Sequence, residues 1–130
     1  AKPRLTSNVS DITEERLDCI MEDDELSRIA MEVILNAGDG RQCIDQALEC
    51  LASLDFAGAD QQLVEAEEKI LKAHQAQTET IQRQAAGEDI AYSLLFTHAQ
   101  DTLMTISTEL HMTQKMMPIV RALAAARKEN

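Results

Sequence analysis

The chain has 130 residues, with two Phe, one Tyr and no Trp, and its formal net charge at pH 7 is −11. This length predicts one domain. A composition poor in aromatic residues, Pro and Gly favours long helices with an aliphatic, methionine-rich core over a sheet. The negative charge argues against nucleic acid and anionic membrane surfaces as partners, because both require clustered Lys and Arg.

The first segment lacks a sustained apolar period and is rich in Asp and Glu. We therefore expect residues 1–23 to form a mobile acidic arm, with a short helix near residues 12–21, ahead of a domain over residues 24–130. The arm has no apolar signal region, and no stretch of the chain approaches transmembrane length. The three cysteines form no paired motif, so we expect reduced thiols and a cytoplasmic location.

A first helix is predicted to begin near residues 23–24, where either Asp can act as N-cap, and to end near Leu54. From Leu26 onwards its apolar residues alternate between spacings of four and three, straight through Gly38 and Gly40. A loop would reset this phase, so the pattern predicts one continuous helix. Each glycine costs about 1 kcal/mol there and is best tolerated where another backbone or a ligand comes close.

The corner at residues 55–58 contains an N-cap, and a second helix follows to about residue 84. A third helix starts within residues 89–93 and runs to about residue 126, with Pro118 expected to bend it or weaken its last turns. These elements predict an all-α fold of three long antiparallel helices. Three helices have too few layers to cover every apolar face, so we also expect self-association.

The third helix carries two stripes at helical spacing. One is aliphatic and should face the core of the chain: Leu95, Ala99, Leu103, Ile106, Leu110, Thr113, Met117 and Val120. The other, here named the polar seam, should pack against copies of itself around a symmetry axis: Leu94, His98, Asp101, Thr105, Thr108 and Met112.

The polar seam and its surroundings hold the candidate functional residues. An imidazole (His98), a carboxamide (Gln100) and a carboxylate (Asp101) occur within four positions. An imidazole with donors and acceptors nearby can be poised near neutral pH, and a covered carboxylate needs a partner or a cation. His74 is predicted either to line the same pocket or to make a structural hydrogen bond, and His111 to lie on the surface.

Other site types have no support in the sequence. None of the three histidines has Glu three residues before it, as a di-metal carboxylate bundle requires. There is no Walker-type glycine loop and no nucleophile elbow around a serine. A single reactive histidine on a helix remains.

Residues 98–105, reading His-Ala-Gln-Asp-Thr-Leu-Met-Thr, resemble the active-site signature of one enzyme family. It is the lactose/cellobiose (N,N'-diacetylchitobiose) class of enzyme IIA in the phosphoenolpyruvate-dependent sugar phosphotransferase system. Residues 34–41, 55–59 and 73–81 also resemble that family. In total the resemblance covers about residues 26–125.

The resemblance implies a homotrimer of nine helices with active sites between subunits. His98 would be the phosphorylated residue, and Gln100 would help line the site. Asp101 of each subunit would meet its two copies on the three-fold axis around a metal ion, usually magnesium; three carboxylates sharing a proton are the alternative. The chain departs from the family at Thr102, where the family usually has His, and at Gly40, where it usually has Ala.

The function implied is that of a phosphotransferase subunit. It would accept a phosphoryl group from the carrier HPr on its histidine and pass it to a cysteine of the cognate IIB subunit. It would thereby serve the IIC membrane transporter without touching the sugar. Two alternatives remain: a histidine phosphotransfer domain of a signalling relay, and a non-catalytic helical adaptor. Oligomeric state and phosphate acceptance separate the three.

Overall fold

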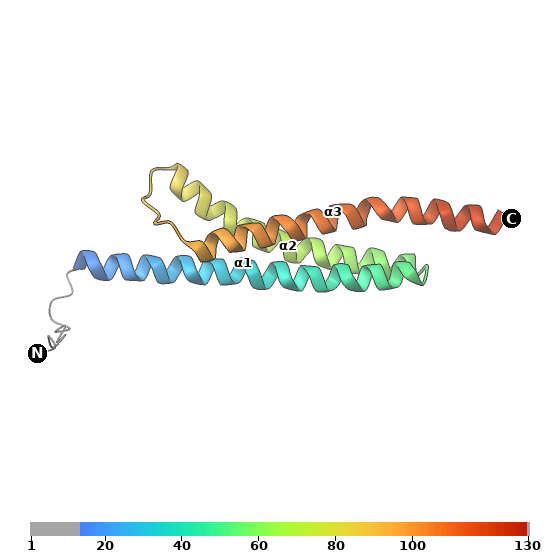
Figure 1. Ribbon diagram of the computed structural model, residues 1–130, viewed down its shortest axis with the longest axis horizontal. Coiled ribbons are helices and arrows are strands. Elements are labelled where there is room, and N and C mark those ends of the chain that lie inside the picture. Colours follow the sequence, from blue (N-terminus) through green and yellow to red (C-terminus); the bar gives the residue numbers. More distant parts are fainter. Residues whose placement is uncertain (1–13, 130) are drawn as a thin grey trace, which may run out of the picture.

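The computed structural model describes residues 14–129, which form three long helices and no strand (Figure 1). They are α1 (Glu14–Ala52), α2 (Phe56–Ala85) and α3 (Leu94–Glu129). The second helix runs back along the first, and α3 then runs in the direction of α1 and extends past the α1–α2 corner (Figure 1). The predicted all-α fold of three antiparallel helices is confirmed.

The start of the first helix differs from the prediction. We placed it near residues 23–24, and α1 begins at Glu14. The acidic residues that indicated an arm are favourable in the first turns of a helix, where they face the positive end of its dipole. Elongating an existing helix also costs far less than nucleating a new one. Residues 1–13 lie outside the described part of the chain, so the mobile arm stays a prediction.

Helix α1 continues without a break through both glycines, as predicted. Gly40 is buried, and a Cβ atom added there would lie 2.8 Å from Cγ1 of Ile70 and 3.4 Å from the carbonyl oxygen of Ala66. Gly38 is exposed, and a Cβ atom there would meet nothing within 4 Å. Gly40 therefore permits the close approach of α1 and α2, whereas Gly38 has no such role within one chain.

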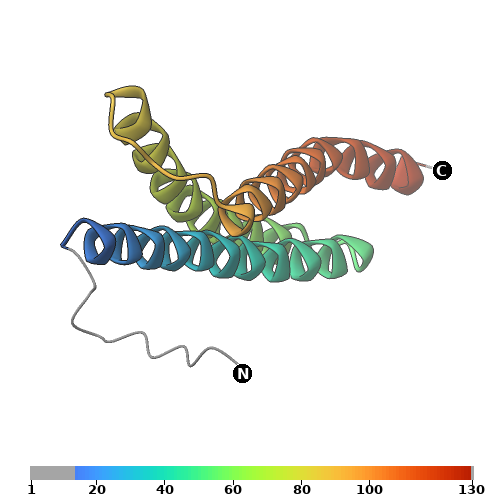
Figure 2. The same cartoon turned by 60° about the vertical axis from the view of Figure 1, so that its left-hand side comes forward.

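Side-chain caps set the starts of the other two helices. The carboxylate of Asp55 accepts the backbone N–H of Gly58 at 3.0 Å, which confirms the predicted cap of α2. The hydroxyl of Ser93 accepts the backbone N–H of Phe96 at 3.1 Å and starts α3. Pro118 lies inside α3 without ending it, and Figure 2 shows the axis of α3 changing direction in its second half.

The core is built from small and aliphatic side chains of all three helices: Ala30, Val33, Ala37, Ile44, Ala47, Leu51, Ala59, Leu63, Ala66, Ile70, Ala73, Ala99, Leu103, Ile106, Leu110 and Met117. The predicted aliphatic stripe of α3 faces this core, with its end residues Leu95 and Val120 half-buried against it. Alanines at the α1–α2 contact let the two helices pack closely.

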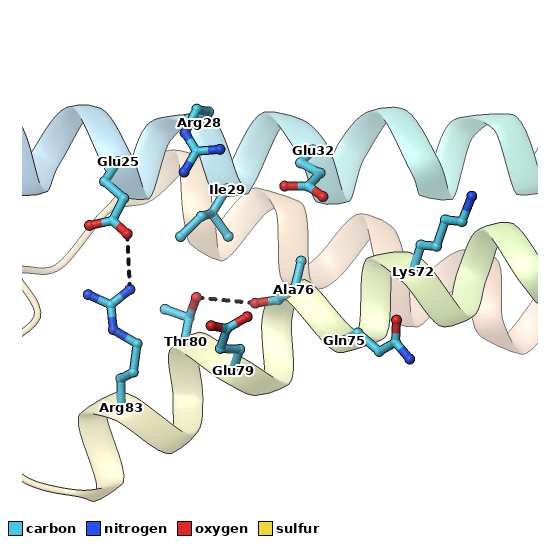
Figure 3. A pocket seen from close by; sticks show the side chains of 10 residues that line it. All are labelled: Glu25, Arg28, Ile29, Glu32, Lys72, Gln75, Ala76, Glu79, Thr80 and Arg83. Carbon is cyan, nitrogen blue, oxygen red and sulfur yellow. Dashed lines mark hydrogen bonds and ion pairs between the residues drawn. The ribbon is translucent and has the colours of Figure 1, made fainter.

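The second half of α2 diverges from α1 (Figure 2). The divergence leaves a groove of about 310 Å³ with charged walls (Figure 3). Arg83 of α2 crosses it to Glu25 of α1 at 3.3 Å and also pairs with Glu88 at 2.6 Å. At the middle of the molecule, Arg41 of α1 donates to both carboxylate oxygens of Glu109 of α3, at 2.9 and 2.7 Å. Ion pairs thus connect both α2 and α3 to α1.

Candidate functional site

All six residues of the polar seam lie outside the core of the chain. His98, Asp101, Thr105 and Thr108 are exposed, and Leu94 and Met112 expose 74% and 55% of their surface. Within one chain the carboxylate of Asp101 is therefore solvated and has no burial cost. That cost arises only when other molecules cover the seam.

Threonine hydroxyls in the seam and beside it are hydrogen-bonded to carbonyl oxygens of their own helix. Thr102 Oγ1 donates to the carbonyl oxygen of His98 at 2.9 Å, and Thr105 Oγ1 donates to that of Asp101 at 2.8 Å. With their protons engaged, these oxygens offer only acceptor lone pairs to anything above the seam. Within one chain, Thr102 therefore presents only an acceptor oxygen where the resembled family usually has an imidazole.

Gln100 lies on a different side of α3 from His98. Gln100 follows His98 by two positions, and each position turns the helix by about 100°, so the two side chains point about 200° apart around the axis. Gln100 accordingly lines a cavity of about 240 Å³ together with residues of α2 and of the loop before α3, and His98 does not line it. Within one chain the two predicted site residues are not brought together, so any contact between them has to cross a subunit interface.

His74 projects from α2 and has a partner of its own. Its Nε2 atom lies 3.2 Å from Oγ of Ser107 on α3, in a part-buried position. Ser107 follows His98 by nine residues, about 13.5 Å along the helix and half a turn around it. In one chain His74 thus makes the structural hydrogen bond that was one of its two predicted roles, away from His98. Its place in a pocket formed by several chains stays a prediction.

Sequence reasoning did not identify Ser107 as the partner of His74. Ser107 stands between Ile106 and Thr108, with Thr105 and Glu109 nearby, so nothing in the sequence singled it out as buried. Identifying the partner required the register between α2 and α3, which the sequence pattern does not supply. The exposed His111 agrees with the predicted surface position.

Of the two described cysteines, Cys43 shows no sign of activation as a nucleophile. Cys43 and Cys50 are free and half-buried on α1. Burial raises the pKa of the Cys43 thiol, which keeps it protonated and unreactive.

A metal site is not complete within one chain. Among the side chains that the structure describes, no three His, Cys, Asp or Glu lie close enough together to hold an ion. Asp101 supplies carboxylate oxygens, which suit magnesium, but it is a single ligand. The hydroxyl oxygen of Thr105, one turn further along α3, has its proton engaged and so presents a lone pair, which is compatible with a nearby cation. The donor set fits magnesium only when several copies of Asp101 converge.

No helix in the described part of the chain is long and apolar enough to span a membrane.

The amino-acid sequence is similar to those of known proteins that are all IIA components of sugar phosphotransferase systems. The chain is similar to the PTS system lactose-specific EIIA component of Staphylococcus epidermidis, with 42% identity over 85 residues, covering 65% of this chain and 82% of that protein. It is also similar to the lichenan-specific phosphotransferase enzyme IIA component of Bacillus subtilis, with 35% identity over 104 residues, covering 80% of this chain and 94% of that protein.

Solved structures agree with these relatives. The PTS cellobiose-specific enzyme IIA from Bacillus anthracis superposes with a TM-score of 0.71 at 37% identity, covering 75% of this chain and 90% of that one. PtcA from S. mutans superposes with a TM-score of 0.74 at 37% identity, covering 75% and 96%. The family model for the PTS system lactose/cellobiose-specific IIA subunit matches residues 28–121. The chain therefore belongs to the lactose/cellobiose-specific IIA subunit family of the sugar phosphotransferase system.

Proposed function

We propose that His98 accepts a phosphoryl group from phospho-HPr and passes it to a cysteine of the cognate IIB subunit, which serves sugar uptake through the IIC transporter. The observation that carries the proposal is the exposure of His98 on an uninterrupted helix of a chain in this family. His74 is engaged with Ser107, and the Cys43 thiol is kept protonated. The cytoplasmic location stays a prediction.

The first transfer exchanges one P–N bond for another. A ring nitrogen of His98 attacks the phosphorus as the bond to the HPr imidazole breaks, and one proton moves from the acceptor ring to the donor ring. In the second transfer, the IIB thiolate attacks and a P–S bond replaces the P–N bond, and the proton lost by the thiol ends on the His98 ring as neutral imidazole is restored. The chain needs only to position these groups and stabilise the charge.

The beginning of α3 suits the added negative charge. His98 is the fifth residue of the helix, which starts at Leu94. A phosphoryl group attached there lies near the positive end of the helix dipole, and it carries up to about two negative charges. This supports His98 over His111, which lies more than three turns further along α3.

We further propose that the active unit is a homotrimer around the polar seam. Large apolar side chains are exposed along α3, in addition to the seam's polar residues: Leu94, Met104, Met112, Met116, Ile119 and Leu123. Packing α3 against copies of itself covers much of this surface. We propose that Gln100 and His74 of one chain approach His98 of another in this trimer, because neither does so within its own chain.

A trimer around the seam brings three copies of Asp101 together on its axis. Like charges a few Å apart cannot all stay ionised without compensation. A magnesium ion, which prefers oxygen ligands, is our proposed partner, with a shared proton as the alternative. The ion is structural and takes no part in the transfer.

The test is phosphorylation with phosphoenolpyruvate, enzyme I and HPr, followed by intact mass measurement. We expect the mass to rise by one phosphoryl group in the parent protein, and not in His98→Ala. His74→Ala and His111→Ala are matched controls and should still be labelled. Label that persists in His98→Ala would refute the assignment. Absence of any transfer from HPr to the parent would favour the phosphorelay or adaptor alternative.

A further inference from the structure

Thr102 lies one turn of α3 after His98, and side chains four positions apart are neighbours on a helix. A helical side chain also leans over the turn that precedes it, so Thr102 leans towards His98. Thr102 is half-buried, although His98 and Asp101 beside it are exposed. A hydroxyl group is thus held next to the imidazole that we assign as the phosphoryl acceptor.

Helix α1 covers one side of Thr102. Glu109, seven residues after Thr102 and so on the same side of α3, pairs with Arg41 of α1 at 2.7 Å. Because α1 and α3 run in the same direction (Figure 1), Ile34, seven residues before Arg41, lies at the level of Thr102. Ile34 packs against the core and has no hydrogen-bonding group in its side chain. At this level α1 therefore presents an apolar side chain to the Thr102 hydroxyl.

The present hydrogen bond of the Thr102 hydroxyl can be given up at little cost. Oγ1 donates to the carbonyl oxygen of His98 at 2.9 Å. In a continuous α-helix this oxygen also accepts the backbone N–H of Thr102, so it keeps a partner when the hydroxyl turns away. Threonine divides between two χ1 rotamers in helices, whereas valine and isoleucine hold one. The hydroxyl can therefore turn without a change in the backbone.

A phosphoryl group on His98 has few hydrogen-bond donors near it on α3. The neighbours one turn away on the same face are Leu94, Leu95, Asp101 and Thr102. Two of them are apolar, and an ionised Asp101 carboxylate can only accept hydrogen bonds. Two backbone N–H groups of the first turn are already bonded to Ser93. Among these four neighbours, only Thr102 has a side chain that can donate.

We propose that Thr102 donates a hydrogen bond to the phosphoryl group on His98 and so stabilises the phosphorylated form. This inference rests on the proposed function. On phosphorylation, Oγ1–H turns from the neutral carbonyl oxygen of His98 to a charged phosphoryl oxygen, which is the stronger acceptor. The hydroxyl keeps its proton, and the only covalent change is the exchange of P–N bonds. Where the family usually has His, this chain supplies an uncharged donor.

The test measures how the phosphoryl group partitions between HPr and this chain. Purified phospho-HPr, free of enzyme I and phosphoenolpyruvate, is mixed with the full chain, and intact masses give the phosphorylated fraction of both proteins at equilibrium. Thr102→Val keeps the shape of the side chain and removes the donor. We expect it to shift the equilibrium towards phospho-HPr about tenfold, which corresponds to about 1.4 kcal/mol. Thr102→Ser keeps the hydroxyl and should partition like the parent.

Thr113→Val is the matched control. Thr113 Oγ1 also donates to the carbonyl oxygen four residues back, at 2.8 Å, but this side chain is buried and lies about 22 Å further along α3 than His98. The control should partition like the parent. Thr102→Ala is a second variant in case valine disturbs assembly, which sedimentation of each variant reports.

The outcomes separate this inference from the proposed function. If the parent accepts the phosphoryl group and both Thr102→Val and Thr102→Ala partition like the parent, the inference is refuted and the proposed function stands. An equal shift in Thr113→Val, or no rescue by Thr102→Ser, also refutes the inference. A parent that accepts no phosphoryl group from phospho-HPr refutes both.

Discussion

Gly38 and Gly40 of α1 allow a sharp test of how α1 packs against α2, because only one of them faces α2. Both are helical, about three turns or more from either end of α1, and only Gly40 faces another helix. Replacing a helix-interior glycine by alanine gains about 1 kcal/mol from backbone conformational preference. At Gly38 nothing lies within 4 Å of the added Cβ atom, so we expect Gly38→Ala to gain the full amount.

At Gly40 the same gain is opposed by a clash. The added Cβ atom would lie 2.8 Å from Cγ1 and 3.3 Å from Cδ1 of Ile70. Carbon atoms pack best at about 3.5–4.0 Å, so Ile70 has to move by at least about 0.7 Å. Cγ1 is next to a branched Cβ atom and cannot move independently of the core. Overpacking of this kind costs about 1–3 kcal/mol, so Gly40→Ala should be less stable than Gly38→Ala by that amount.

Urea unfolding followed by circular dichroism measures this difference. Protein concentration must be the same for all variants, because association adds to apparent stability. A double-mutant cycle identifies the cause: in an Ile70→Ala background, Gly40→Ala should become stabilising by about 1 kcal/mol. Equal gains at both glycines would refute the close approach at Gly40. A loss at Gly38 would show that its surroundings are not open.

Three further predictions concern charged side chains. Asp101→Leu should preserve or strengthen the proposed trimer, whereas Asp101→Lys should disrupt it by placing three cations on the axis. Sedimentation equilibrium with and without chelator tests both, and a parent that is monomeric at micromolar concentration contradicts the trimer. Arg121→Ala should cost about 0.5–1.5 kcal/mol, because Arg121 pairs with Asp60 at 2.8 Å and lies 4.7 Å from the centre of an aromatic ring of α2. Hydrogen exchange near the end of α3 should then quicken, and unchanged exchange would count against this role. A hydrogen bond from Arg83 lowers the pKa of the Glu88 carboxyl, so this pair contributes stability above the unfolded pKa and loses it as pH falls through the folded pKa. Arg83→Gln should raise the pKa of Glu88 towards its ordinary value in an NMR titration; an unchanged pKa would contradict the pairing.

The sequence alone determined the features that depend on local periodicity. The aliphatic stripe of α3 was read correctly because residues three and four apart share a face in any helix. The uninterrupted passage through Gly38 and Gly40 followed from the same phase, and the cap at Asp55 from side-chain chemistry within three residues. The start of α1 at Glu14 was missed, because an acidic stretch without apolar period is compatible with both an arm and the first turns of a helix.

Tertiary structure alone decided which side chains meet across helices. The rotation and register of α2 against α3 put His74 beside Ser107, and the divergence of α2 from α1 accompanies the ion pair of Arg83 with Glu25 across the groove. Gln100 is close to His98 in sequence, but the helix places it in the lining of a cavity that His98 does not reach. Such contacts depend on how entire helices pack, and helix packing is set by the sum of many small apolar contacts rather than by any local motif.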